Sequence, residues 1–375
     1  MPEEITQPIP AVRAFSESSR SAELSAAAQL LILGIELRED DLVHKGYAER
    51  HGGAFIPIED RAALQLPVPT VRAGGKRFSR SEVRRSNDEI RILPQVPQNA
   101  RRPSIARTAQ SFYTDPTPFT AAQLFEAALH HPAEIIRVAA AVSYPRITAD
   151  YADLIGILEA GTFSSDRLVL KVAANALGHL APDHPRLSEL RRHRRTGGPA
   201  SPAHTAILVH GTWASDQPWW QPGGDFFTYC HENVRPDLYG GADRYEWSGG
   251  YSDAARSVAA VELVSWLQKH SALDATIISH SHGGSVAMLS THEAMSMEEL
   301  VLLSCPVHIP KYLPDFSHVG KVVSIRVRLD LVIMADRGGQ RFPSPIEENV
   351  LPVWFDHSAT HDPAIWEKYK VPSML

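Results

Sequence analysis

The chain has 375 residues, of which 43% are hydrophobic and 21% are charged, and its formal net charge is -6. This ordinary globular composition with a slight acidic excess excludes a protein that binds nucleic acid through a basic surface. No apolar run is long enough to span a membrane, and the longest lies near residues 26–35.

The sequence shows neither the pattern of a secretory signal nor that of a disulfide framework. The first ten residues are acidic and polar, so they do not read as a secretory signal. Cys230 and Cys305 are the only cysteines, which is too few for a disulfide framework. We therefore expect a reducing compartment and a cytoplasmic protein.

Residues 1–115 form an N-terminal region of unclear structure that we expect to be partly disordered. Within it, residues 22–35 favour a helix. Residues 71–107 contain ten Lys or Arg against three Asp or Glu. Such a basic run is either a docking arm for an acidic partner or a solvated linker, and its composition favours the linker.

Residues 116–196 are predicted to be helical. Amphipathic patterns cover 119–129, 134–142 and 167–177, and the last two superpose with a period of 34 residues. This period and the alanine-rich faces resemble a HEAT-like helical repeat. With two units only, we expect the segment to pack on a neighbour, either as a structural support or as a surface for a protein partner. Residues 197–202, rich in Gly and Pro, are the predicted linker to the next domain.

From residue 203 onward, β-branched runs alternate with helical patterns. This alternation predicts an α/β domain over 203–375, with a mostly parallel sheet of about six strands and helices on both faces. In such sheets, functional residues lie at the carboxyl ends of strands. The expected strands are 205–210, 244–247, 276–280, 300–305, 321–327 and 350–355, and the expected helices are 253–269, 282–293 and 362–370.

The stretch 279–284, Ser-His-Ser-His-Gly-Gly, follows a predicted buried strand and precedes a predicted helix. A serine in a sharp strand-to-helix turn needs small residues two positions before and after it, because the backbone passes close by. Ser279 and Gly283 satisfy this requirement around Ser281. A glycine-rich phosphate loop is the alternative, but no complete phosphate-binding signature is present. Ser281 is therefore the candidate nucleophile.

A serine hydroxyl needs a histidine base and a carboxylate that orients this base. Asp330 lies just past the predicted strand 321–327, and His357 lies just past the predicted strand 350–355. These positions are the candidate acid and base. Asp336 is the alternative acid, and His361, at the entry of the following helix, is the alternative base.

An oxyanion hole requires two backbone N–H groups directed at the developing negative charge. One is expected from His282, which follows the nucleophile. The other is expected from Thr212, in the loop after the first strand. Trp213, Trp219 and Trp220 follow in that loop, where they either line an acyl pocket or pack in the core.

Taken together, residues 203–375 resemble the α/β-hydrolase superfamily, and in particular the compact bacterial lipases and esterases. The resemblance rests on His-Gly-Thr at 210–212, His-Ser-His-Gly-Gly at 280–284, the stretch 324–333 that contains Asp330, and His357 before a helix. Ser279 departs from the glycine that is commoner there. The resemblance implies hydrolysis of a small-molecule or lipid ester through an acyl-enzyme, without a metal or cofactor.

Two other functions remain open at this point. The same residues suit thioester or amide hydrolysis equally well. Alternatively, a hydrolase-like domain that has lost activity serves as a scaffold next to the helical segment, although all three triad positions are filled. The connection 306–320 is too short for a large lid, so we expect an accessible site and a short or soluble acyl group.

Overall fold

The computed structural model describes residues 12, 14–15, 18–37, 71, 77–89, 105–190, 205–272, 274–293 and 296–375. The chain divides into two compact units, here called unit 1 (Met1–Lys45 with Pro57–Leu180) and unit 2 (Gly46–Ile56 with Ala181–Leu375). The predicted linker 197–202 and most of the basic run 71–107 lie outside the described residues.

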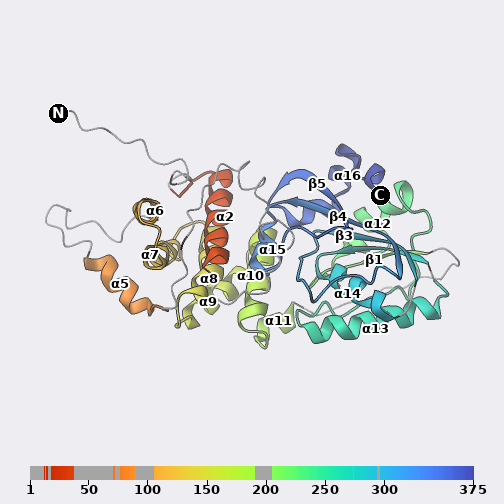
Figure 1. Cartoon of the computed structure of the whole chain (residues 1–375), viewed down its shortest axis with the longest axis horizontal. Helices are drawn as coiled ribbons and strands as arrows, with labels where there is room; N and C mark the ends of the chain where they lie inside the picture. The colour runs from red at the N-terminus through yellow and green to blue at the C-terminus, as the bar shows by residue number, and fades with distance from the viewer. Residues whose placement is uncertain are drawn as a thin grey trace. The chain divides into compact units, whose positions relative to one another are not determined.

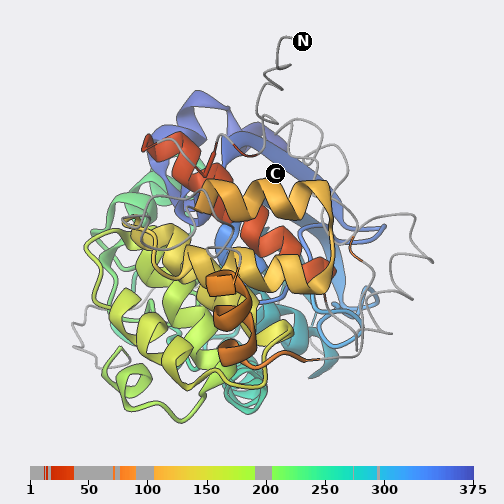
Figure 2. The same cartoon turned by 90° about the vertical axis from the view of Figure 1, so that its left-hand side faces the viewer.

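Unit 1 is helical throughout its described part (Figures 1 and 2). Helix α2 covers the helix expected over 22–35, and it packs against α8, which also contacts α7, α9 and α10. The two segments with the 34-residue period fall in α8 and α10, and their HEAT-like character stays a prediction. The helices are α2 (Arg20–Glu36), α5 (Arg80–Glu89), α6 (Ile105–Thr114), α7 (Pro118–Ala128), α8 (Glu134–Ser143), α9 (Ala152–Gly161) and α10 (Arg167–Leu180).

Helices α2 and α8 approach closely because small residues meet at their contact. A Cβ atom added to Gly34 would lie 2.6 Å from the Cβ atom of Ser143. The Ser143 hydroxyl donates a hydrogen bond to the carbonyl oxygen of Leu30 at 2.9 Å. The small side chains of these helices therefore permit backbone contact, as the alanine-rich sequence predicts.

Two arginines of the basic run form ion pairs inside unit 1. The Arg80 Nε atom lies 3.0 Å from Glu126 Oε2, and the Arg84 Nε atom lies 2.7 Å from Glu126 Oε1. Arg80 also reaches Asp153 at 2.9 Å. Burial acts to raise the pKa of Glu126, but the hydrogen bonds from both arginines outweigh it and lower this pKa. These two cations thus neutralise acidic groups of their own unit.

Unit 2 contains a parallel sheet whose five strands stand in the order β1-β2-β3-β4-β5, which is also their order in the chain. Strands β1 and β2 are buried along their whole length, as expected for a parallel sheet that is covered on both faces. The strands are β1 (Ala206–Val209), β2 (Ala275–His280), β3 (Met297–Leu303), β4 (Val319–Arg328) and β5 (Glu347–Trp354).

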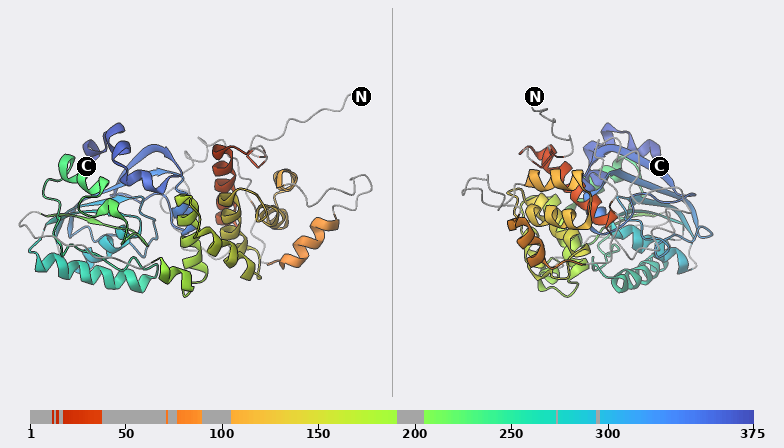
Figure 3. Two further views of the ribbon diagram at one scale, coloured as in Figure 1. Left: turned by 180° about the vertical axis from the view of Figure 1, so that it is seen from behind. Right: turned by 60° about the vertical axis from the view of Figure 1, so that its left-hand side comes forward.

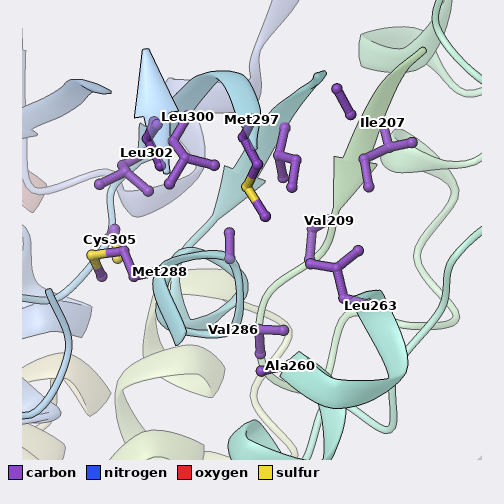
Figure 4. Packing of buried hydrophobic residues seen from close by; sticks show 14 of the residues in the cluster. Ile207, Val209, Ala260, Leu263, Val286, Met288, Met297, Leu300, Leu302 and Cys305 are labelled. Carbon is purple, nitrogen blue, oxygen red and sulfur yellow. The ribbon is translucent and has the colours of Figure 1, made fainter. Parts of the chain in front are cut away.

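Alternate residues of β1 to β4 enter two separate hydrophobic cores. Ile207, Leu300 and Leu302 pack with α13 (Asp253–Lys269) and α14 (His282–Ser290) on one face, which Figure 4 shows from close by. Residues one position away pack on the other face with α12 (Asp225–Asn233) and α16 (Pro363–Lys368). The two helix layers on either side of the sheet can be followed in Figure 3. These layers hold the carboxyl ends of the strands in fixed positions.

The segment 244–247, which the sequence analysis expects as a strand, does not join the sheet in the structure. Its aromatic residues are buried for another reason. The Tyr245 hydroxyl donates to the carbonyl oxygen of Ala259 at 2.7 Å, and Trp247 Nε1 donates to that of His210 at 2.8 Å. The outer edge of β1 is instead bridged by Leu238. Aromatic residues that anchor a loop thus produced a strand-like pattern.

Cys230 and Cys305 are buried free thiols, and burial raises the pKa of both. Neither is poised to ionise, which fits a packing role. Among the helices that the structure describes, none has both the length and the apolar character required to cross a bilayer. The cytoplasmic location stays a prediction.

Candidate active site

Ser281 occupies the sharp turn between β2 and α14. Its φ is 54° and its ψ is -132°, a combination that residues with a side chain rarely adopt. Its N–H donates to the carbonyl oxygen of Leu303 at 2.8 Å, which ties the turn to β3. A Cβ atom on Gly283 would lie 2.5 Å from the carbonyl oxygen of His210, so only glycine fits there. Ser281 itself is 8% exposed, so the turn presents its side chain at the edge of the core.

Asp330 and His357, which follow the carboxyl ends of β4 and β5, contact each other. The Nδ1 atom of His357 lies 2.7 Å from Asp330 Oδ2, and both side chains are buried. The other oxygen of Asp330 accepts hydrogen bonds from the N–H groups of Val332 and Ile333, so it also caps α15 (Leu331–Ala335). The Gln340 side chain bonds both backbone groups of Asp330: its Oε1 atom accepts from the N–H, and its Nε2 atom donates to the carbonyl oxygen. The carboxylate is therefore fixed from several directions.

The alternative acid and base lie in other surroundings. Asp336 bonds His282 and His308, with the Nε2 atoms at 3.0 and 2.7 Å. His361 stacks on Trp219, with ring centroids 4.1 Å apart and planes 13° apart. Of the two acids named in the sequence, Asp330 is thus the one in contact with His357.

His280, the last residue of β2 and the neighbour of Ser281 in sequence, contacts His357. His280 Nε2 lies 3.2 Å from the carbonyl oxygen of His357, and the two rings make an edge contact with centroids 4.6 Å apart. Within the described part of the chain, no hydrogen bond involves the Ser281 hydroxyl. Catalytic hydrogen bonds of this kind are often long without substrate and tighten in the reacting complex.

The loop after β1 lies against the serine. A Cβ atom on Gly211 would be 2.8 Å from the Cβ atom of Ser281, so the loop passes as close as a glycine permits. Trp213 has a φ of 54°, and its N–H donates to the carbonyl oxygen of Gly249 at 3.1 Å. The Thr212 hydroxyl and the Trp213 Nε1 atom are buried without a hydrogen-bond partner among the described residues.

The three tryptophans near this loop differ in their surroundings. Trp220 is 1% exposed, and its Nε1 atom donates to the carbonyl oxygen of Ala214 at 2.8 Å. Trp219 also belongs to the core on the α12 side of the sheet. Trp213 stacks on Tyr251, with centroids 5.6 Å apart and planes 8° apart. Trp219 and Trp220 thus pack in the core, whereas the pocket role of all three tryptophans stays a prediction.

A second polar cluster surrounds Asp336, and it includes His282 next to the serine. The Asp336 Oδ1 atom accepts hydrogen bonds from the Tyr251 hydroxyl at 2.6 Å and from His282 Nε2 at 3.0 Å, while Oδ2 accepts one from His308 Nε2 at 2.7 Å. Tyr251 and His308 carry no local sequence signal that points to this site. We call these four residues the Asp336 cluster.

The charge states in the cluster follow from burial and from neighbouring charges. Burial, reinforced by the nearby Arg256 guanidinium, lowers the pKa of His282 to about 4, so its imidazole is neutral at pH 7. Burial acts to raise the pKa of Asp336, but the interactions with His282 and His308 outweigh it and hold this pKa well below its usual range. Asp336 is therefore an ionised acceptor that is surrounded by donors.

Three members of the cluster offer metal-binding atoms. The ligand atoms of His282, His308 and Asp336 lie within 4.8 Å of one another. Both oxygens of Asp336 already accept hydrogen bonds, however, and Arg256, which is 4% exposed, adds a positive charge next to them. The arrangement therefore suits an Asp336 carboxylate that is stabilised by hydrogen bonds better than a bound divalent cation.

The chain matches no family model and no curated protein. Among solved structures, it is similar to an extracellular α/β-hydrolase from a Paenibacillus species, at 19% identity and a TM-score of 0.21, over 28% of this chain and 43% of that one. A predicted CIB-like hydrolase from Thermoplasma acidophilum shares 12% identity at a TM-score of 0.31, over 46% of this chain and 87% of that one. Lipase B of Aspergillus fumigatus shares 12% identity at a TM-score of 0.28, over 73% and 78% of the two chains. The chain thus spans less than half of the Paenibacillus enzyme, and its function is inferred from the geometry of its own site.

Proposed function

We propose that this protein is a serine hydrolase of the α/β-hydrolase type that cleaves carboxylic esters through an acyl-enzyme. One observation carries the proposal. The buried pair of His357 and Asp330, 2.7 Å apart, stands at two strand ends of the same sheet whose β2 ends in the strained Ser281 turn. A strained serine turn against the loop after β1, together with a histidine that a buried carboxylate orients, supports acyl transfer.

In the first half of the reaction, Ser281 Oγ attacks the carbonyl carbon of the ester while its proton passes to His357 Nε2. The backbone N–H groups of Thr212 and His282 donate to the negative oxygen that forms. Collapse of this intermediate breaks the bond between the acyl carbon and the alcohol oxygen, and the proton on His357 moves to that oxygen.

In the second half, a water molecule attacks the acyl carbon of the Ser281 ester and gives a proton to His357. Collapse breaks the bond to Ser281 Oγ, which takes the proton back. The products are one alcohol and one carboxylic acid, and the enzyme returns to its starting state. No electron transfer occurs, so the step needs no redox partner.

The role of Asp330 follows from its contacts. Because Nδ1 of His357 donates to Asp330 Oδ2, the lone pair of His357 lies on Nε2, where a base must have it. The hydrogen bonds that Oδ1 accepts from the N–H groups of Val332 and Ile333 keep the carboxylate from turning away, and Gln340 holds the backbone of Asp330. Asp330 therefore serves both as a helix cap and as the orienting acid.

The substrate class is a small-molecule ester. The connection between β3 and β4 contains no helix, so no long lid covers the serine turn from that side. Trp213, next to the oxyanion loop and stacked on Tyr251, supplies an apolar wall for a short acyl group.

The test is labelling with a fluorophosphonate probe, which reacts with an activated serine. The native chain should be labelled, and Ser281→Ala should not. Ser279→Ala and Ser285→Ala are matched controls, because both serines flank the turn and should leave labelling intact. Labelling of Ser281→Ala at the native rate would exclude the proposed nucleophile, and absence of labelling in the native chain would favour an inactive scaffold.

A substrate panel then separates the bond types. The p-nitrophenyl butyrate ester, a butyryl thioester and a butyryl anilide share the acyl group and differ in the leaving group. We expect the highest kcat/KM for the ester. His357→Ala should abolish turnover and His361→Ala should retain it, whereas the reverse result would reassign the base.

A further inference from the structure

The Asp336 cluster is not needed for the proton transfers described above, yet it is buried directly beside the oxyanion hole. Asp336 is the C-cap residue of α15, whose N-cap is Asp330, and it is 4% exposed. Its Oδ1 atom holds two donors at once, the Tyr251 hydroxyl at 2.6 Å and His282 Nε2 at 3.0 Å. A single carboxylate oxygen therefore joins two segments that lie far apart in sequence.

The first of these segments carries one proposed oxyanion donor directly. The backbone N–H of His282 opens α14, and the side chain of the same residue is fully buried and bound to Asp336. The first N–H groups of a helix have no partner inside the helix, so their direction depends on what holds the first turn. The imidazole of His282 is such an anchor.

The second segment reaches the other proposed donor. The Tyr251 ring stacks on Trp213, the neighbour of Thr212, and makes an edge contact with the ring of His282. The carbonyl oxygen of Tyr251 accepts a hydrogen bond from Arg256 at 2.7 Å, so this segment is itself fixed. The loop that carries Thr212 thus packs, through Trp213, on Tyr251, whose hydroxyl donates a hydrogen bond to Asp336.

We propose that Asp336 is a positioning residue for the oxyanion hole, because its Oδ1 atom fixes His282 and Tyr251 and thereby aligns the N–H groups of His282 and Thr212. The inference rests on the proposed function, since it assigns a role within the same site. Donors to an oxyanion act only over a narrow range of distance, so a small rotation of either segment lowers the rate. Asp336 is ionised and buried, which makes it a strong and permanent acceptor.

The test compares three variants in the full chain. Asp336→Asn keeps the shape and removes the charge, and Tyr251→Phe removes one donor to Oδ1 and keeps the aromatic stack. His292→Gln is the control, because His292 Nε2 donates to the carbonyl oxygen of Leu313 and lies outside the Asp336 cluster. The probes are p-nitrophenyl butyrate and a butyl trifluoromethyl ketone, whose adduct with the serine places a negative oxygen in the oxyanion hole. Active sites are counted with the fluorophosphonate, so that kcat refers to folded enzyme.

For Asp336→Asn, we expect kcat per counted site to fall about 10- to 100-fold with KM changed by less than about twofold. The ketone should bind more weakly by a similar factor, because it depends on the same N–H groups. Tyr251→Phe should show a smaller loss in the same direction. His292→Gln, whose ring bonds Leu313 and does not contact the Asp336 cluster, should stay within about twofold of the native enzyme.

Two results would overturn the inference. The first is an Asp336→Asn enzyme whose kcat per counted site and ketone affinity both match the native values, since a purely structural role would lower only the number of folded sites. The second is a stoichiometric metal ion in the purified protein that is lost in Asp336→Asn, because the carboxylate would then be a ligand. Failure of Ser281 labelling would instead reject the proposed function, so the two failures are distinguishable.

Discussion

The backbone strain at Ser281 predicts an unusual stability difference between two substitutions. Ser281→Ala and Ser281→Gly both remove the hydroxyl, but only the glycine variant relieves the strain at φ 54° and ψ -132°. These angles lie outside the left-handed helical region, so a residue with a Cβ atom is penalised there by roughly 2–3 kcal/mol. We expect both variants to be inactive and the glycine variant to be the more stable one.

The magnitude follows from three contributions. Relief of strain adds roughly 2–3 kcal/mol, whereas the greater freedom of glycine in the unfolded chain costs about 0.7 kcal/mol. The loss of one nearly buried carbon costs about 0.8 kcal/mol more. The net gain of Ser281→Gly over Ser281→Ala is therefore about 1 kcal/mol, or a shift of about 0.5 M in the urea midpoint.

Urea unfolding followed by tryptophan fluorescence is the suitable assay. All seven tryptophans lie within residues 205–375, so the signal reports on the sheet that carries the serine. Ser285 provides the matched control, because it lies inside α14 with ordinary helical geometry. There, glycine should be less stable than alanine by about 1 kcal/mol. A glycine variant at 281 that is also less stable than its alanine counterpart would refute the reasoning about strain.

Four further predictions concern the same site. Asp330→Asn should lower kcat by roughly 10³- to 10⁴-fold at nearly unchanged stability, because asparagine caps α15 equally well, whereas Asp330→Ala should also lose about 1 kcal/mol in urea unfolding. Thr212→Val should not destabilise the protein, since its buried hydroxyl has no partner in the described structure, and kcat should change by less than about threefold because the backbone N–H is the donor. The pKa of His282 falls from 6.5 to about 4 on folding, so between these pH values the unfolded chain binds a proton that the folded protein does not. The free energy of unfolding should therefore be highest above pH 6.5 and should fall by up to about 3 kcal/mol as the pH approaches 4. His282→Gln should lack this loss in unfolding curves at pH 7 and pH 4. Finally, p-nitrophenyl butyrate should be hydrolysed with a higher kcat/KM than the palmitate ester.

Each of these predictions has an outcome that contradicts it. Equal activity of the native enzyme and Asp330→Asn would remove the orienting acid from the proposal. A large loss of kcat in Thr212→Val would assign the oxyanion contact to the hydroxyl instead of the backbone. Identical pH profiles for the native protein and His282→Gln would show that this imidazole does not titrate between pH 4 and 6.5. A clear preference for the palmitate ester would point to a long acyl channel.

The sequence permits prediction of those features that depend on local order along the chain. Ser281, Asp330 and His357 are candidates because each lies just past an apolar strand; the structure places Asp330 in contact with His357, and the catalytic roles stay a prediction. The parallel sheet with helices on both faces was predictable for the same reason. Among the described residues the sheet has five strands and not the expected six, because burial of Tyr245 and Trp247 through side-chain contacts gives the same apolar pattern as a strand.

Features that depend on contacts between distant segments could not be predicted. Tyr251 and Asp336 are 85 residues apart, and nothing in the residues around either one indicates that they share a hydrogen bond. Asp336 was considered only as an alternative acid, whereas its contacts place it beside His282. A carboxylate after a strand has several available roles, and only the three-dimensional arrangement selects among them.

The strand order of the sheet has a consequence for the protein during its synthesis. Because each strand pairs with the one made just before it, the sheet can be extended at a single edge as the chain leaves the ribosome. The serine turn contacts only β1, β2 and β3, whereas the proposed acid Asp330 follows β4 and the proposed base His357 follows β5. A nascent chain can therefore form the serine turn before the proposed acid and base are in place, so any activity of Ser281 would begin only when the last strand has joined the sheet.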